Sequence, residues 1–117
     1  MEKSTIEGLQ WSEFEKVEIR IGTILEAKDF PEARKPAYQL VIDFGAEIGI
    51  RKSSAQLTKR YAIGDLVGKQ IVAVVNFPKK QIGNFMSECL VLGSVGAEND
   101  IVLLTSDTRV ENGLRIG

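Results

Sequence analysis

The sequence contains no histidine, and this absence removes several kinds of chemistry. Histidine is the commonest general base near neutral pH and the commonest metal ligand in proteins. Without it, no Ser/His or Cys/His nucleophile pair can form. The glycines are scattered, and none belongs to a GxGxxG or GxxxxGK[ST] phosphate-binding pattern. The residues therefore predict a protein that is not an enzyme and that holds no metal or other cofactor.

Cysteine and long apolar runs are also scarce. The single cysteine, Cys89, can form neither an internal disulfide nor a multi-thiolate metal site, and its apolar strand predicts a small core residue. No apolar stretch approaches the ~18 residues that a membrane-spanning helix needs. The first ten residues, MEKSTIEGLQ, lack the apolar core of a secretory signal. These absences predict a cytoplasmic protein without a membrane span.

The 117 residues predict a single domain over 1–117, and 44% hydrophobic residues can supply its core. Alternating or β-branched segments predict six strands, at residues 17–25, 38–44, 50–56, 70–77, 87–95 and 101–105. Residues 57–66 predict the main helix. Gly22 predicts a bulge or a bend of the kind that curls a small sheet into a barrel. The pattern favours an all-β fold with minor helix, a five- to six-stranded Greek-key barrel of the OB-fold type, with a small sandwich as the alternative.

Two further segments carry local predictions. The spacing of Ser12 and Glu15 is that of a capping box, which predicts a short helical turn with Trp11 and Phe14 available for burial. Residues 78–84 predict an exposed loop that begins at a proline.

Positive charge is concentrated in the middle of a chain whose net charge is only −1. Residues 34–80 carry nine bases and three acids, whereas both flanking segments are acidic. Four dibasic pairs lie in this stretch: Arg34-Lys35, Arg51-Lys52, Lys59-Arg60 and Lys79-Lys80. Adjacent side chains of a strand point to opposite faces, so only loop pairs can offer both charges to one partner. The segregation predicts a surface for polyanions, anchored on Arg34-Lys35 and Lys79-Lys80.

Several segments resemble a known family. Residues 14–24 (FEKVEIRIGTI) resemble the opening of the tRNA-binding OB domain that occurs alone or appended to aminoacyl-tRNA synthetases. Residues 29–38 (DFPEARKPAY), 52–56 (KSSAQ) and 75–82 (VNFPKKQI) resemble the stand-alone bacterial CsaA proteins more closely. The resemblance implies an OB-fold that binds tRNA, commonly as a homodimer. It also implies a chaperone or export-related role, in which the partners are unfolded or pre-secretory proteins.

The candidate RNA-binding residues combine this resemblance with the charges. We expect the Lys and Arg side chains of the groove to bind phosphates. We expect the neighbouring polar and aromatic residues to contact exposed nucleotides. The predicted set is Arg34, Lys35, Lys52, Ser53, Asn76, Lys79, Lys80, Phe85 and Ser87. Ser53, Asn76 and Ser87 have a second interpretation, in which they bond loop backbone. The appended domains have Gly-Met where this chain has Cys89-Leu90, which weakens direct transfer of their tRNA contacts and fits the CsaA branch.

The alternative function requires an exposed apolar surface for polypeptides. The candidates are Phe30, Tyr38, Phe77, Phe85 and Met86. Phe77 ends an apolar strand, so core packing is the favoured interpretation there, whereas stacking and packing stay open for Phe85. The ends of the chain, 1–16 and 106–117, have two interpretations. Their apolar residues close the barrel, or, as the resemblance to CsaA implies, these extensions contribute to a dimer interface.

Overall fold

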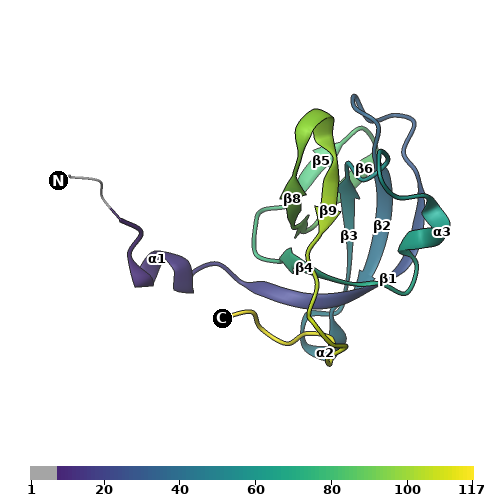
Figure 1. Cartoon of the computed structure of the whole chain (residues 1–117). Helices are drawn as coiled ribbons and strands as arrows, with labels where there is room; N and C mark the ends of the chain where they lie inside the picture. Colours follow the sequence, from purple (N-terminus) through teal and green to yellow (C-terminus); the bar gives the residue numbers. More distant parts are fainter. Residues whose placement is uncertain (1–7) are drawn as a thin grey trace.

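The structure is a computed structural model that describes residues 8–117. Its centre is a five-stranded antiparallel sheet in the order β3-β2-β1-β4-β7, curled into a nearly closed barrel (Figure 1). The five strands are β1 (Ile19–Asp29), β2 (Tyr38–Asp43), β3 (Ile50–Ala55), β4 (Gln70–Val74) and β7 (Leu90–Val91). The predicted all-β barrel of the OB type, with few short helices, is confirmed.

Two hairpins and four short helical segments complete the described chain. The hairpins pair β5 (Lys80–Ile82) with β6 (Phe85–Ser87), and β8 (Gly93–Val95) with β9 (Ile101–Leu103). The helical segments are α1 (Trp11–Glu15), α2 (Gly45–Ile48), α3 (Ile63–Leu66) and the 3-10 turn η1 (Ala97–Asn99). None of the helices within residues 8–117 is long and apolar enough to cross a membrane.

Strand β1 joins the two halves of the barrel because it changes partner along its length. Residues 19–23 pair with β4, and residues 23–29 pair with β2. The register shifts between Ile24 and Glu26, so Leu25 is the extra residue of a β-bulge. The bulge therefore lies at Leu25, and of the two alternatives predicted for Gly22 the bulge is wrong.

Gly22 has a different purpose, which is to leave room for the core. A Cβ atom at this position would lie 2.7 Å from Ile42 Cγ2 and 2.7 Å from the Phe44 ring. Both of these side chains are fully buried. Glycine thus allows β1 to approach the inner face of β2 and the residue that follows it.

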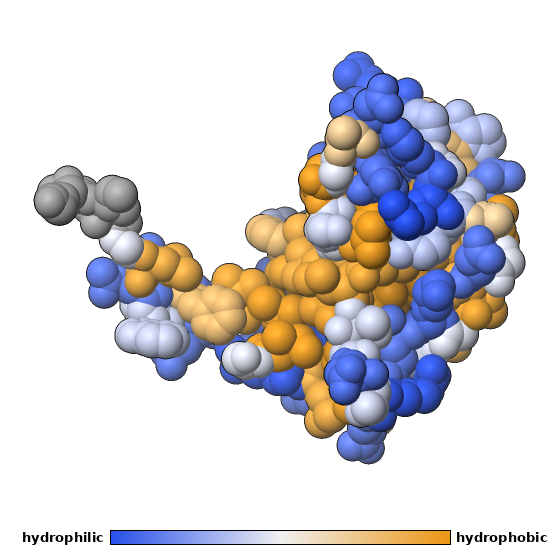
Figure 2. Space-filling model, in the orientation of Figure 1, coloured by the Kyte–Doolittle hydropathy of each residue, from blue (hydrophilic) through white to orange (hydrophobic). Residues whose placement is uncertain are grey.

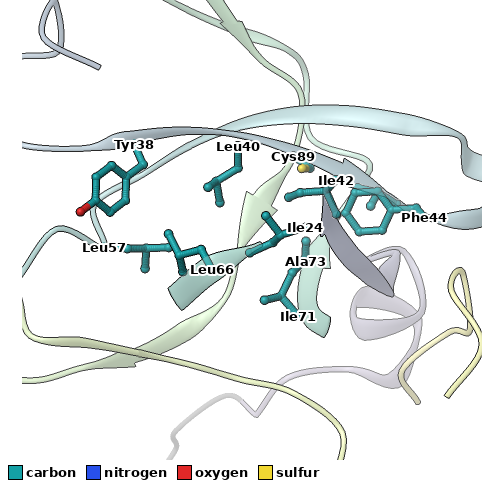
Figure 3. Close-up of a cluster of buried hydrophobic side chains, with 11 residues drawn as sticks. Ile24, Tyr38, Leu40, Ile42, Phe44, Leu57, Leu66, Ile71, Ala73 and Cys89 are labelled. Atoms are coloured by element: carbon teal, nitrogen blue, oxygen red, sulfur yellow. The ribbon is translucent and has the colours of Figure 1, made fainter. Parts of the chain in front are cut away.

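The main core fills the barrel with side chains from β1, β2, β4 and the segments that connect the strands (Figure 3). Ala55 of β3 and Val91 of β7 pack against it. Ile24, Leu40, Ile42, Phe44, Leu66 and Ile71 are fully buried. Complete burial of one such side chain stabilises the fold by about 1.5–3 kcal/mol. Tyr38 also belongs to this core, and its hydroxyl donates a hydrogen bond of 2.7 Å to the Tyr61 carbonyl.

The barrel closes where β3 meets residues 87–89, and side chains replace part of the strand ladder. The Glu88 N–H donates to the Lys52 carbonyl (2.7 Å), and Glu88 Oε1 accepts from the Lys52 N–H (2.8 Å). Ser87 Oγ accepts from the Ser54 N–H (3.1 Å). Ser53 Oγ, fully buried, donates to the Cys89 carbonyl (2.9 Å). These bonds satisfy the backbone at the edge of β3.

The C-terminal segment adds to the first part of β1. Ile21 and Ile116 donate backbone hydrogen bonds to Leu114 (3.0 Å) and Ile19 (2.8 Å). Gly113 has a φ of 93°, and a Cβ atom there would lie 2.5 Å from the Phe44 carbonyl oxygen. Only glycine fits this close backbone contact.

The α1 segment lies away from the barrel, at the end of an extended arm (Figure 1). Trp11 is 83% exposed, so the expected burial of this side chain does not occur within the chain. Figure 2 shows an apolar surface that runs from this arm onto the neighbouring face of the barrel.

Several local predictions need correction. The helix expected over 57–66 is only the four-residue α3, because a turn occupies the residues before it. The loop expected over 78–84 contains β5 and the turn of a hairpin. The strand expected over 87–95 is divided among β6, β7 and β8. Helix α1 begins after Gln10, whose N–H donates to Glu13 Oε1 (2.8 Å), and not after Ser12.

Replacing Gly22 with alanine tests the close approach of β1 to the core. We expect Gly22→Ala to lower the free energy of unfolding by about 1–3 kcal/mol, because the added methyl group overpacks the space held by Ile42 and Phe44. Urea unfolding followed by circular dichroism measures the change. Gly64→Ala is the control, since nothing lies within 4 Å of a Cβ at Gly64. A Gly22→Ala protein as stable as the control would contradict this account.

Candidate nucleic-acid interface

A groove runs over β3 between the β5–β6 hairpin and the loop of residues 31–37. It consists of two adjoining cavities of about 790 and 610 Å³. Both cavities are lined by Ser54, Gln56, Lys80, Gln81 and Ile82. The larger cavity continues to Phe77, Pro78 and Leu90, and the smaller one to residues 32–35. Segments far apart in the sequence therefore form one continuous surface.

A small second core holds the two sides of this groove in place. Phe30, Ala37 and Phe85 are buried together, and Ala33 and Ile82 pack against them. The Phe30 and Phe85 ring centroids lie 5.3 Å apart with an interplanar angle of 57°, a favourable tilted geometry for two aromatic rings. This contact joins the loop of residues 31–37 to the hairpin. The position of one side of the groove thus determines the position of the other.

The groove brings together the two dibasic pairs that the sequence places in loops. Arg34, Lys35 and Lys80 line the smaller cavity, and Lys79 and Lys80 line the larger one. Acidic groups are fewer: Glu32 lines the smaller cavity, and Glu88 Oε2 lies 3.5 Å from Lys79 Nζ. Lys52 Nζ lies 5.2 Å from the centroid of the buried Phe85 ring, within the range of a cation–π contact.

The other basic residues of the middle stretch have different partners. Arg51 donates to the Val75 carbonyl (2.9 Å). Lys59 and Arg60 form ion pairs with Glu98 (3.2 Å) and Asp100 (2.7 Å). The pair with Arg60 lowers the pKa of the Asp100 carboxyl through a hydrogen bond to the guanidinium. Strand alternation and ion pairing thus separate these residues from the groove.

Ser53 is the predicted RNA-binding residue whose position fits that role least. It is fully buried and its hydroxyl donates to the Cys89 carbonyl, which fits the second interpretation, in which Ser53 bonds backbone. Its neighbour Ser54 lines both cavities instead. The period-two pattern from Lys52 to Leu57 contains the missed signal, because Lys52 and Gln56 are polar on one face while Leu57 marks the buried face. The same pattern identifies Gln56.

Asn76 and Ser87 both make hydrogen bonds within the protein. Asn76 Oδ1 accepts from the Glu18 N–H (2.9 Å), and its Nδ2 donates to the Lys16 carbonyl (2.7 Å). These two bonds fit the interpretation in which Asn76 secures loop backbone. Ser87 bonds the Ser54 N–H and also lines the larger cavity, so its hydroxyl reaches the groove.

Four of the aromatic candidates differ from the sequence prediction in whether they are buried or exposed. Phe30, Tyr38 and Phe85 are buried, so the prediction that they form an exposed apolar surface is wrong. Phe77 is 56% exposed and lines the larger cavity, so its predicted core packing is also wrong. Strand β4 ends at Val74, which leaves Phe77 outside the alternation that would have buried it. Met86 is half-buried.

Cys89 is the small core residue that the sequence predicts. Burial raises the pKa of its thiol to about 12, because the thiolate would lose its hydration in this position. The thiol is therefore protonated at neutral pH. Leu90, the next residue, is half-exposed and lies at the edge of the larger cavity.

Known proteins of similar sequence and structure show the family of this chain. Residues 19–115 match the family model described as a putative tRNA binding domain. The chain belongs to this family. The solved structure of the chaperone CsaA from Bacillus anthracis str. Ames is 50% identical and has a TM-score of 0.90, over 95% of this chain and all of that one. CsaA from Picrophilus torridus is 49% identical with a TM-score of 0.88, over 94% of this chain and all of that one.

Longer proteins contain a similar segment. Methionine–tRNA ligase of Methanocaldococcus jannaschii is 29% identical over 95% of this chain, and that of Thermococcus onnurineus is 31% identical over 98%. The chain spans only 17% and 15% of the lengths of these two ligases. The resemblance to CsaA-like proteins of the tRNA-binding domain family is therefore confirmed.

Proposed function

We propose that this CsaA-like protein is a tRNA-binding module that works without catalysis. The observation that carries the proposal is the convergence of Arg34-Lys35 and Lys79-Lys80 on one groove. The family match to a putative tRNA binding domain supports the choice of tRNA as the polyanion. Because tRNA acts in the cytoplasm, we also infer a cytoplasmic location.

The mechanism is neutralisation of RNA phosphates by Lys and Arg side chains whose backbone is held rigidly. The Phe30–Phe85 contact fixes the spacing of the two basic segments, so less conformational entropy is lost when RNA binds. Lys52 adds a further charge beside the hairpin. The hydroxyl groups of Ser54 and Ser87 supply neutral hydrogen-bonding groups at the base of the groove. Contacts to phosphates position the RNA, and contacts to bases add selectivity.

Charge reversal of the hairpin lysines tests this function. We expect the Lys79→Glu, Lys80→Glu double variant to lower tRNA affinity at least tenfold at low salt. For the unchanged protein, log affinity should fall with log salt at a slope of about −4 if roughly five phosphates are neutralised, and the double variant should have a shallower slope. Filter binding at several salt concentrations measures both values.

The matched control is Lys28→Glu with Lys69→Glu, which makes the same change in net charge at positions outside the groove lining. This control should keep most of the affinity. Salt-independent binding of tRNA, or equal losses in the two double variants, would contradict the proposed groove.

A second candidate function is the binding of unfolded or pre-secretory polypeptides. Two solved relatives of about 50% identity are described as CsaA chaperones. A third cavity, of about 360 Å³, lies beside the groove and is lined largely by apolar residues, among them Leu90 and Val95. Val95 is 74% exposed. An exposed apolar cavity of this kind fits apolar side chains of an extended chain.

Suppression of aggregation tests the second function. We expect the protein to reduce light scattering by an unrelated denatured protein, and Val95→Asp to weaken this effect because a charge enters the apolar cavity. Val67→Asp, at a 52% exposed position outside this cavity, is the control. Because Leu90 lines both this cavity and the groove, excess tRNA should weaken the suppression. Equal behaviour of the two variants would contradict the assignment of the cavity.

We also propose that the chain forms a homodimer through its two ends. Of the predicted extensions 1–16 and 106–117, residues 1–7 lie outside the described part of the structure. Leu9, Trp11 and Leu114 are exposed apolar side chains in the described parts of these extensions. Arg115 connects the two ends, since it donates to the Glu15 carbonyl (3.0 Å). A two-fold dimer would bury these side chains and present two grooves to one RNA.

Replacing Trp11 with aspartate tests the dimer. We expect Trp11→Asp to shift the mass measured by sedimentation at micromolar concentration from the dimer to the monomer, because a charge replaces a large apolar side chain in the interface. The same Val67→Asp variant serves as control and should remain dimeric. An unchanged protein that sediments as a monomer would overturn the proposal.

A further inference from the structure

We propose that Phe77 is a stacking platform for an unpaired base, so that the groove selects single-stranded segments of RNA over duplex. This inference rests on the proposed RNA-binding function and specifies which part of an RNA enters the larger cavity. The argument uses the presentation of Phe77, the hydrogen-bonding groups around it and the position of the nearby charges.

Phe77 is exposed in spite of its size, and the loop that carries it is firmly anchored. On its N-terminal side, the Val75 carbonyl accepts from Arg51 (2.9 Å), and the Val75 N–H donates to the Glu18 carbonyl (2.8 Å). Asn76 adds its two hydrogen bonds to the backbone of Lys16 and Glu18. On its C-terminal side, Pro78 restricts the backbone. These contacts fix the backbone that presents the ring to the groove.

An aromatic ring in such a position has a use in RNA binding. Stacking of a base on an aromatic side chain requires an exposed ring face beside a positively charged track for the backbone. Phe77 lines the same cavity as Lys79 and Lys80, which supply that track. Because the backbone before Phe77 is anchored, little backbone entropy is lost when a base stacks on the ring.

The polar groups of the cavity suit the edge of a base. Gln81 Nε2 donates to the Gly83 carbonyl (2.6 Å), which leaves Gln81 Oε1 as an acceptor without a partner among residues 8–117. Gln56 Oε1 accepts from Asn99, which leaves the Gln56 amide as a donor without a partner in the same described range. A donor and an acceptor on one surface match the edge of an unpaired base.

These features favour an unpaired nucleotide over the two other possible occupants, an RNA duplex and an apolar peptide side chain. A duplex keeps its base faces stacked inside the helix, so it cannot use the Phe77 ring. An apolar peptide side chain could occupy the cavity, but it would leave the neighbouring lysines and glutamines unused. The larger cavity with Lys79 and Lys80 adjoins the smaller one with Arg34 and Lys35, so basic residues continue along the groove beyond the stacked base.

The experiment compares a 12-nucleotide single-stranded RNA of mixed sequence with the same RNA annealed to its complement, by fluorescence anisotropy at one salt concentration. We expect the single strand to bind at least tenfold more tightly. Phe77→Leu should reduce single-strand affinity about tenfold, within the range that loss of one stacked base produces, and should leave duplex affinity unchanged. Phe77→Trp should retain binding, and its added indole fluorescence should be quenched by the single strand. Val67→Ala, an exposed apolar position outside the groove, is the control.

The outcomes separate this inference from the function on which it rests. If Phe77→Leu binds the single strand as well as the unchanged protein, or if duplex binds equally well, the stacking platform is wrong. If tRNA binding still falls on charge reversal of Lys79 and Lys80, the proposed function stands without it. Quenching of the Phe77→Trp variant by an unfolded apolar peptide, but not by the single strand, would overturn the inference in favour of a peptide site.

Discussion

The double hydrogen bond between Lys52 and Glu88 is the interaction on which the groove depends. Glu88 uses its backbone N–H and its carboxylate to bond both backbone groups of Lys52, so a single residue continues the ladder of β3 where no regular strand pairs with it. The same carboxylate lies 3.5 Å from Lys79 Nζ. The Glu88 carboxylate therefore contributes both to closure of the barrel and to the surroundings of a groove lysine. Loss of this carboxylate would leave a backbone donor unsatisfied and a groove lysine without its neighbour.

A second hydrophobic cluster, separate from this closure, supports the groove. The Phe30–Phe85 pair and the small residues around it lie apart from the barrel core, and they connect the loop of residues 31–37 to the β5–β6 hairpin. The basic residues lie on these two segments and on no other part of the groove lining. Apolar burial beneath the charged surface fixes these two segments, and only a few acids, Glu32 and Glu88, accompany the basic residues. Buried aromatic residues thus support the groove while basic residues line it, and Phe77 is the exception because it is an aromatic residue of the lining.

Much of the fold was accessible from the sequence, and the exceptions have physical reasons. Alternation and β-branched runs identified the strands of the barrel, and charge segregation identified both basic loops. Ser53 and Ser54 illustrate a limit, since neighbours in a strand differ only in which face they occupy, and the choice depends on register with the core. Phe77 and Phe85 illustrate another. Whether an aromatic residue packs or projects depends on where β4 ends and where the hairpin turns, and these points are determined by long-range contacts such as those of Asn76.

The contact between Gly113 and the Phe44 carbonyl limits which residues can occupy position 113. Terminal segments usually tolerate substitution and drift faster than the domain they follow. Here a residue near the C-terminus faces the backbone that follows β2 so closely that every side chain is excluded. Among homologous chains with this arrangement, we expect position 113 to vary as little as the barrel core, while the residues beyond β9 that make no such contact diverge freely.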